Sequence, residues 1–171
     1  MESRSTTNSP VDDDAGITLR PAEPEDEPFL FKVYASTRAD EMAAWGLDAA
    51  QQESFLRMQF RAQQGTYGMQ YEAADHRIIM KGQEPVGRIL VNRTEDEILL
   101  VDIALLAESR NEGIGSRLIR DLQREARQAG VPVNLHVLKS NEMAARLYER
   151  LGFKSVGGDS VYAQMSWLPE T

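Results

Sequence analysis

The chain has 171 residues, and 19 lysine and arginine residues against 27 aspartate and glutamate residues give it a formal net charge of −8. A chain of this length buries enough surface to fold as one domain without crosslinks, and its acidity argues against binding nucleic acid or anionic membranes through overall charge. It contains no cysteine, which excludes disulfides, thiolate catalysis and cysteine-based zinc sites, and its two histidines argue against a metal site built from several histidines.

The first sixteen residues (MESRSTTNSPVDDDAG) are rich in serine, threonine and aspartate. They hold almost no large apolar side chain, so we expect residues 1–16 to form a disordered tail. No signal-peptide pattern is visible, and no apolar run approaches the ~20 residues of a membrane span. The absence of cysteine suits a reducing compartment. We therefore expect a cytoplasmic protein with one folded domain over residues 17–171 and with no membrane or nucleic-acid partner.

The first half of that domain is predicted to contain a short strand, two helices and three more strands. Ile17–Arg20 alternates as a strand, and the prolines and acids of residues 21–28 suit the start of a helix. A second helix is predicted over Asp48–Gln64, with Asp48 as its N-cap and Gly65 as its stop. Short turns separate the strand-like runs at 76–82, 85–94 and 95–106, which predicts an antiparallel meander.

The second half alternates helices and strands. Apolar side chains recur at helical spacing from Gly113 to Ala129, and Gly130 is the expected stop. A strand over 131–138, a helix over Asn141–Leu151 and a closing hairpin over 153–168 follow. The predicted order is therefore β, α, α, β, β, β, α, β, α, β, β, which indicates an α+β fold with a mixed sheet.

The segment RNEGIGSRL, Arg110 to Leu118, lies where a strand gives way to a helix. Gly113 and Gly115 lack side chains, so backbone N–H groups at the helix N-terminus can approach an anion, with the helix dipole behind them. The segment lacks the third glycine of a dinucleotide-binding fingerprint and the lysine of a P-loop. Ordinary turn chemistry explains two glycines equally well when they are taken alone.

Together with NLHVLKSNEMAARLYERLGF, Asn134 to Phe153, this segment resembles the GCN5-related N-acetyltransferase (GNAT) family over about residues 17–168. The resemblance implies the acyl-CoA N-acyltransferase fold: a mostly antiparallel sheet splayed between its fourth and fifth strands, with helices on both faces. It also implies direct transfer of an acetyl group from acetyl-CoA to a primary amine of a small molecule or peptide in a ternary complex, without a metal. The alternative is a non-catalytic acyl-CoA-binding or protein-interaction module. The oligomeric state stays open, with a homodimer among the options.

The resemblance also assigns a coenzyme A site. Backbone N–H groups of the loop from Arg110 to Ser116 would bind the pyrophosphate, and Asn141 would contact the pantetheine arm as well as cap its helix. The Leu105 N–H would point at the thioester oxygen as an oxyanion-hole donor. The cofactor-binding residues expected on this basis are Leu105, Arg110, Gly113, Ile114, Gly115, Ser116 and Asn141. Glu112 replaces a basic residue that is frequent in the family, and we expect it to weaken the anion site.

Three residues are candidates for the chemistry. Tyr148 matches the family position usually assigned as the general acid, although its spacing alone would fit a core aromatic. His136 lies mid-strand and is the candidate base. Asp102 interrupts an apolar strand, so it is a rival base or a group that orients His136. His76 is interpreted as a strand-edge residue. The acceptor pocket is expected between the first two helices and the closing strands, near Trp45, Phe55, Phe60, Tyr67 and Tyr71.

Overall fold

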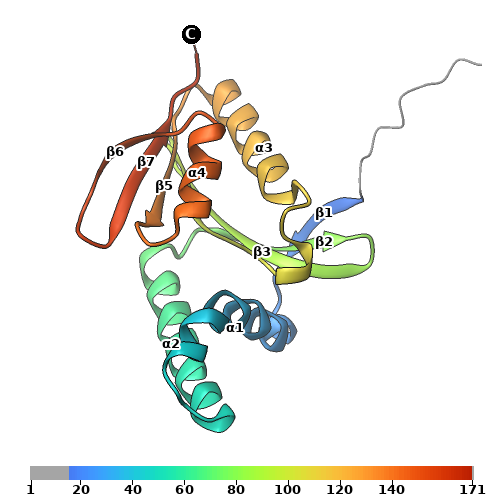
Figure 1. The fold of residues 1–171 in the computed structure, drawn as a ribbon. Helices are drawn as coiled ribbons and strands as arrows, with labels where there is room; N and C mark the ends of the chain where they lie inside the picture. Colours follow the sequence, from blue (N-terminus) through green and yellow to red (C-terminus); the bar gives the residue numbers. More distant parts are fainter. Residues whose placement is uncertain (1–15, 171) are drawn as a thin grey trace, which may run out of the picture.

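The computed structural model describes residues 16–170, which form one seven-stranded sheet with helices on both faces (Figure 1). The strands are β1 (Ile17–Pro21), β2 (Asp75–Lys81), β3 (Glu84–Arg93), β4 (Ile98–Leu105), β5 (Val133–Leu138), β6 (Lys154–Gly158) and β7 (Tyr162–Trp167). The helices are α1 (Glu27–Ala44), α2 (Ala49–Gln70), α3 (Ile114–Ala129) and α4 (Glu142–Arg150), with 3-10 turns η1 (Pro24–Asp26) and η2 (Ala107–Ser109). The predicted order of elements is confirmed. The predicted tail lies, apart from Gly16, outside the described residues.

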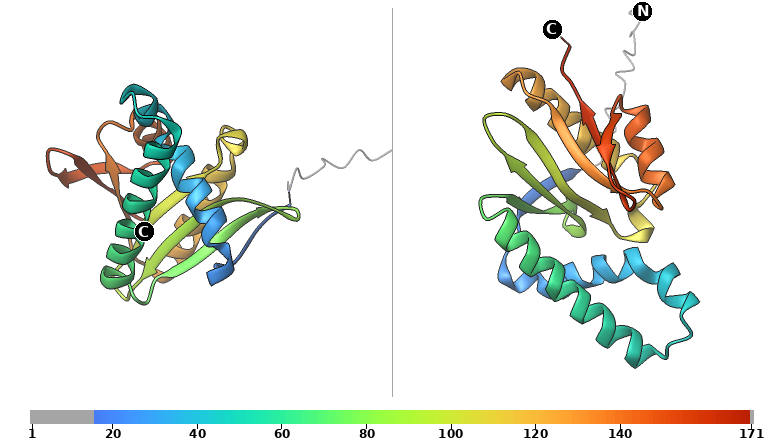
Figure 2. Two further views of the ribbon diagram at one scale, coloured as in Figure 1. Left: turned by 90° about the horizontal axis from the view of Figure 1, so that it is seen from below. Right: turned by 90° about the vertical axis from the view of Figure 1, so that its left-hand side faces the viewer.

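The strand order is β1-β2-β3-β4-β5-β7-β6, and only β4 and β5 run parallel. This parallel pairing joins Ile98–Leu100 to Val133–Leu135 and then stops, although both strands continue. The sheet therefore opens into a wedge beside the second half of β4, as the two diverging parts of the sheet in Figure 2 show. The predicted splay between the fourth and fifth strands is confirmed. His76 lies in β2, between β1 and β3, so its interpretation as a strand-edge residue is wrong.

A bulge in β4 decides which side chains face which layer. Leu90 pairs with Asp102 but Val91 pairs with Leu100, so Val101 is an extra residue in the ladder. Before the bulge the even-numbered Leu100 points into the core beneath α3. After the bulge the odd-numbered Ile103 points into that core. Because side chains alternate along a strand, the bulge turns Asp102 to the opposite face of the sheet.

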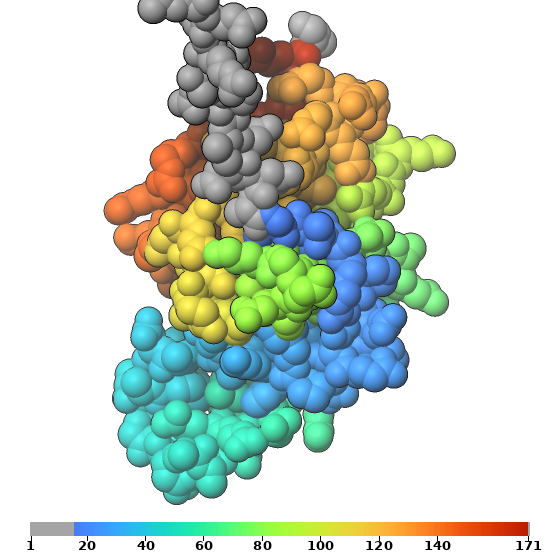
Figure 3. All heavy atoms as spheres, turned by 90° about the vertical axis from the view of Figure 1, so that its right-hand side faces the viewer, coloured from blue at the N-terminus to red at the C-terminus, as the bar shows by residue number. Residues whose placement is uncertain are grey.

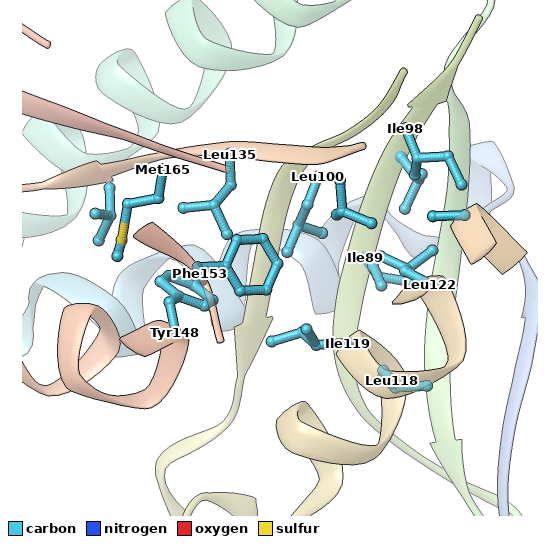
Figure 4. Packing of buried hydrophobic residues seen from close by; sticks show 14 of the residues in the cluster. Ile89, Ile98, Leu100, Leu118, Ile119, Leu122, Leu135, Tyr148, Phe153 and Met165 are labelled. Atoms are coloured by element: carbon cyan, nitrogen blue, oxygen red, sulfur yellow. The ribbon is translucent and has the colours of Figure 1, made fainter. Parts of the chain in front are cut away.

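The two faces carry separate cores. On one face α3 and α4 cover a large cluster that includes Ile119, Leu135, Tyr148 and Phe153, which interlock between helices and strands in Figure 4. On the other face α1 and α2 enclose a smaller cluster around Phe60. None of the helices described within residues 16–170 is both long and apolar enough to span a membrane.

Helix α2 starts as predicted but ends later. Asp48 caps it, accepting a hydrogen bond from the Gln51 backbone N–H at 2.9 Å, and the Gln51 side chain returns one to the Asp48 N–H. The predicted stop at Gly65 is wrong, because the helix continues to Gln70. A glycine in a helix costs only about 1 kcal/mol, and the turn that follows holds Tyr67, which packs over Arg88 of the sheet.

An ion pair ties η1 to β1. Arg20 donates to both carboxylate oxygens of Asp26, at 2.7 and 2.8 Å. This contact, with the backbone N–H of Glu23, lowers the pKa of Asp26 from 3.8 to about 2. A lowered pKa contributes stability that is present above about pH 4 and is lost as the pH falls through about 2.

Replacing Asp26 with asparagine is expected to cost about 1 kcal/mol of unfolding free energy at neutral pH, a value reduced because Arg20 is partly exposed. The cost should shrink as the pH falls towards 2, since the wild-type carboxyl then becomes protonated. Urea denaturation at both ends of this pH range measures it. An equal cost at both ends would contradict the assignment.

Candidate active site

The glycine loop forms a concave backbone turn at the start of α3. Asn111 and Gly113 both adopt left-handed conformations, with φ of 62° and 80°. The N–H groups of Ile114, Gly115 and Ser116 belong to the first turn of α3, where no earlier helical carbonyl is available to accept them. N–H groups that converge in this way attract an anion, and the helix dipole adds to the attraction. The loop therefore has the geometry of a phosphate cradle.

Glu112 does not leave a free negative charge beside this cradle. Its carboxylate binds the Lys81 ammonium at 2.8 Å, and Lys81 ends β2 at the turn into β3. Figure 3 shows this turn, in light green, packed against the yellow loop. The weakening effect expected of Glu112 is thus offset by a cation from a distant part of the sequence.

Arg110 connects the loop to two other elements. Its Nε donates to the carbonyl oxygen of Leu105 at 3.0 Å, and its Nη2 donates to the Ser36 hydroxyl of α1 at 3.3 Å. The Arg110 guanidinium thereby links the loop to the end of β4 and to α1.

The end of β4 offers free backbone groups to the wedge. Leu106 donates its N–H to Val86 of β3 at 2.8 Å. Since successive N–H groups of an extended chain point to opposite sides, the Leu105 N–H points to the β5 side, where the ladder has stopped. Gly87 lies opposite Leu105, and a Cβ there would come within 2.3 Å of the Ala104 carbonyl oxygen. The backbone of β3 therefore packs tightly behind this part of the wedge.

Tyr148 is the buried residue of α4. Its ring packs in the large core, 5.8 Å from the ring of Phe153 between centroids, and only 8% of the residue is exposed. Its hydroxyl has no hydrogen-bond partner within residues 16–170, yet it is not among their fully buried unpaired atoms. Burial, together with the charge of Asp102, raises the pKa of Tyr148 to about 12. The hydroxyl is therefore a protonated donor that an incoming group can reach.

Asp102 is held by Arg88 on the opposite face. The buried guanidinium donates to Oδ2 from Nε, at 2.8 Å, and from Nη2. Gln64 accepts a further hydrogen bond from Arg88 at 3.1 Å. Asp102 Oδ1 has no partner within the described part of the chain, and a quarter of the side chain is exposed. The pairing of Arg88 with Asp102 was not predicted from the sequence. A basic residue inside the apolar run PVGRILV is nevertheless a signal for a buried charge pair.

His136 and Asn141 occupy the places that the sequence predicts for them. His136 is exposed mid-strand in β5, opposite Gln164 of β7, with its neighbours Leu135 and Val137 turned into the core. No hydrogen bond joins it to Asp102 among residues 16–170. Asn141 caps α4, accepting from the Ala144 N–H at 3.2 Å.

The predicted aromatic residues divide among three places. Phe60 belongs to the smaller core, while Trp45 and Phe55 pack together at the junction of α1 and α2. Tyr67 and Tyr71 lie near the Arg88–Asp102 pair, and burial raises the pKa of Tyr67 to about 12, with the charge of Asp102 adding to the shift. The second half of α2 therefore lies beside the Arg88–Asp102 pair.

The sequence matches the model of a known protein family, and the fold matches several solved structures. The model of the "Acetyltransferase (GNAT) family" matches residues 30–153. None of the curated proteins matches the sequence.

Several solved structures share the fold. PaiA N-acetyltransferase from Thermoplasma acidophilum in complex with coenzyme A is 18% identical, with a TM-score of 0.67 over 89% of this chain and 98% of that one. Naa50 from Arabidopsis thaliana in complex with the bisubstrate analogue CoA-Ac-MVNAL is 15% identical, with a TM-score of 0.61 over 89% and 98%. A GNAT family acetyltransferase from Elizabethkingia anophelis with acetyl-CoA bound is 12% identical, with a TM-score of 0.59 over 90% and 98%.

Proposed function

We propose, since the chain belongs to the GNAT family of acetyltransferases, that it transfers an acetyl group from acetyl-CoA to a primary amine of a small molecule or peptide. The observation that carries the proposal is the end of the β4–β5 pairing at Leu100 and Leu135, which leaves the second half of β4 unpaired on that side, next to the loop that starts α3. The transferase domain is taken to span residues 17–171.

The donor would lie along the open edge of β4. The pyrophosphate would accept hydrogen bonds from the backbone of Gly113, Ile114, Gly115 and Ser116, and the pantetheine arm would follow the unpaired edge of β4 past Asn141. The Arg110 side chain would hold the loop in place beside β4 through its hydrogen bonds to Leu105 and Ser36. Structural neighbours that hold coenzyme A or acetyl-CoA support an acyl-CoA as the donor.

Transfer would proceed by direct attack. His136 would remove a proton from the acceptor ammonium, directly or through water, and the free amine would attack the thioester carbon. The Leu105 N–H would stabilise the oxyanion that forms. The carbon–sulfur bond would then break, and the thiolate would leave with its electron pair and a hydrogen bond from Tyr148.

Asp102 would bind the acceptor. Its Oδ2 is occupied by Arg88, and its free Oδ1 can accept an N–H from an amine placed beside the wedge. His136 is the proposed base, and Asp102 is the proposed contact for the acceptor. Naa50, whose structure holds an analogue with a peptide portion, supports peptide amines as one acceptor class.

Titration of the protein with coenzyme A by calorimetry tests the donor site, using two matched glycine variants. Gly113 and Gly130 lie at opposite ends of α3, both have left-handed φ (80° and 71°), and a Cβ at either would meet nothing within 4 Å. Alanine at each should therefore cost a similar ~1 kcal/mol of stability. Only Gly113→Ala is expected to weaken coenzyme A binding, by about tenfold.

Equal affinities for the two variants, or no coenzyme A binding by the wild type, would contradict the proposed donor site. The reaction itself is tested by release of free thiol from acetyl-CoA with a panel of polyamines, amino acids, aminoglycosides and peptide N-termini. Tight coenzyme binding without turnover on any of these amines would favour the non-catalytic module.

A further inference from the structure

The loop that starts α3 is held by side-chain contacts rather than by burial. Arg110, Asn111, Glu112 and Gly113 are all exposed. Within residues 16–170, Asn111 is also the one residue other than glycine with a positive φ, 62°. Such a conformation persists only where the surrounding structure holds it in place. The contacts made by the residues on either side of Asn111 therefore help to set the shape of the loop.

Two distant elements supply these contacts. Before Asn111, Arg110 donates from Nη2 to the Ser36 hydroxyl of α1 at 3.3 Å. After Asn111, Glu112 binds the Lys81 ammonium at the end of β2 at 2.8 Å. In Figure 3 the yellow loop borders the blue atoms of α1 and the light-green turn between β2 and β3. The loop is thus linked, on either side of Asn111, to an element far away in the sequence.

The Ser36 hydroxyl is oriented to accept from Arg110. Its proton is used within α1, where the hydroxyl donates to the Val33 carbonyl oxygen at 2.9 Å. A hydroxyl that donates its proton to one group keeps its lone pairs for another, and a guanidinium can only donate. The helix therefore presents Ser36 to the loop as an acceptor. Because Ser36 is uncharged, it adds no attraction of its own for a phosphate.

Helix α1 extends this link to the opposite face of the sheet. There α1 and α2 enclose the smaller core. The second half of α2 lies beside Arg88, which holds Asp102, the proposed contact for the acceptor. The contact between Arg110 and Ser36 therefore joins the donor loop to the helices that flank the acceptor contact.

We propose that Ser36 is a positioning residue that couples coenzyme A binding to α1. Through Arg110 it holds the loop in the shape that binds the pyrophosphate, and a bound pyrophosphate in turn steadies α1. The inference rests on the donor site of the proposed function. A loop that is already ordered loses less conformational freedom when its ligand binds, so its affinity is higher. Because coupling is reciprocal, the contact that favours the coenzyme must also stabilise α1 once the coenzyme is bound.

Calorimetric titration of the full chain with coenzyme A tests the first half of the proposal. Ser36→Ala is expected to weaken binding about fivefold, since one hydrogen bond that orders the loop is lost. Thr37→Ala is the matched control and should bind within about twofold of the wild type. The Thr37 hydroxyl donates within α1 in the same way, to the Tyr34 carbonyl oxygen at 2.7 Å, and makes no other side-chain hydrogen bond within residues 16–170.

Two further variants separate positioning from a general effect on the fold. Ser36→Thr retains the hydroxyl and should bind coenzyme A within about twofold of the wild type. Arg110→Met removes the guanidinium, and adding Ser36→Ala to it should not weaken binding further, because Ser36 acts only through Arg110. A role of Ser36 in the fold alone would lower the affinity equally in both backgrounds.

Hydrogen exchange followed by mass spectrometry tests the second half. With saturating coenzyme A, the α1 amides around Ser36 should exchange about threefold more slowly than in the free protein. Ser36→Ala should abolish this difference even when coenzyme A saturates the variant.

Three results would overturn the inference and leave the donor site standing, provided that the wild type binds coenzyme A. They are equal affinities for Ser36→Ala and Thr37→Ala, a loss of about fivefold that persists in the Arg110→Met background, and equal protection of α1 in Ser36→Ala and the wild type. Absence of coenzyme A binding by the wild type would overturn the donor site and the role of Ser36 together.

Discussion

Replacing Tyr148 with phenylalanine is expected to lower kcat about 100-fold while leaving coenzyme A affinity within about threefold of the wild type. The ring is held by Phe153 and the large core, so phenylalanine should pack in the same place. What is lost is the hydroxyl that, in the proposed reaction, donates to the departing sulfur. A donor that acts only as charge develops affects the transition state and hardly affects binding.

The pH dependence should separate two roles for this hydroxyl. The pKa of Tyr148 is about 12, well above that of an ordinary thiol, ~8.5. A thiolate would therefore not remove its proton, and in the proposed reaction Tyr148 would stabilise the leaving group as a hydrogen-bond donor. The loss in kcat should consequently be the same from about pH 6 to pH 9.

Tyr34→Phe is the matched control, since Tyr34 is a buried tyrosine of the smaller core whose hydroxyl contacts only Gln59, at 3.4 Å. Steady-state thiol release with both variants makes the comparison. A kcat for Tyr148→Phe within threefold of the control would remove Tyr148 from the mechanism.

The local features of the wedge could be predicted from the sequence because they depend on short-range physics. Gly113 needs a left-handed φ at the start of α3, and Asn141 caps α4 through its own side chain, so both follow from residue type and neighbours. The order of helices and strands along the chain follows from hydrophobic periodicity and short turns. Gly65 shows the limit, because a glycine without a positive φ does not end a helix.

The long-range contacts could not be predicted in this way. The bulge at Val101 reverses the facing of every later residue in β4, and no sequence pattern marks it. Arg88 meets Asp102 only because of that reversal. Lys81 meets Glu112 across 31 positions. The side chain of Arg110 donates to the Leu105 carbonyl oxygen and to the Ser36 hydroxyl, and the sequence predicts neither contact. Each contact depends on how separate elements pack.

The pair of Arg88 and Asp102 leads to the second large effect. Replacing Arg88 with methionine is expected to lower the free energy of unfolding by about 3 kcal/mol, because Asp102 is left without its cation and Gln64 without its donor. The Arg88 side chain is only 4% exposed, so water cannot take its place. Urea denaturation measures the loss. Arg57→Met, which breaks an exposed pair with Glu53, should cost less than about 1 kcal/mol.

The double variant Arg88→Met with Asp102→Leu distinguishes a structural pair from one that is kept for the reaction. Apolar side chains that replace both members of a buried pair restore most of the stability, so the double variant should be at least about 1 kcal/mol more stable than Arg88→Met alone. Its acceptor KM should nevertheless rise about tenfold or more, because Oδ1 of Asp102, the proposed contact for the acceptor, is gone. Recovery of stability together with a wild-type KM would show that the pair serves the fold alone. A stable fold with weakened acceptor binding instead means that the bulge in β4 serves to place a carboxylate where an amine must bind.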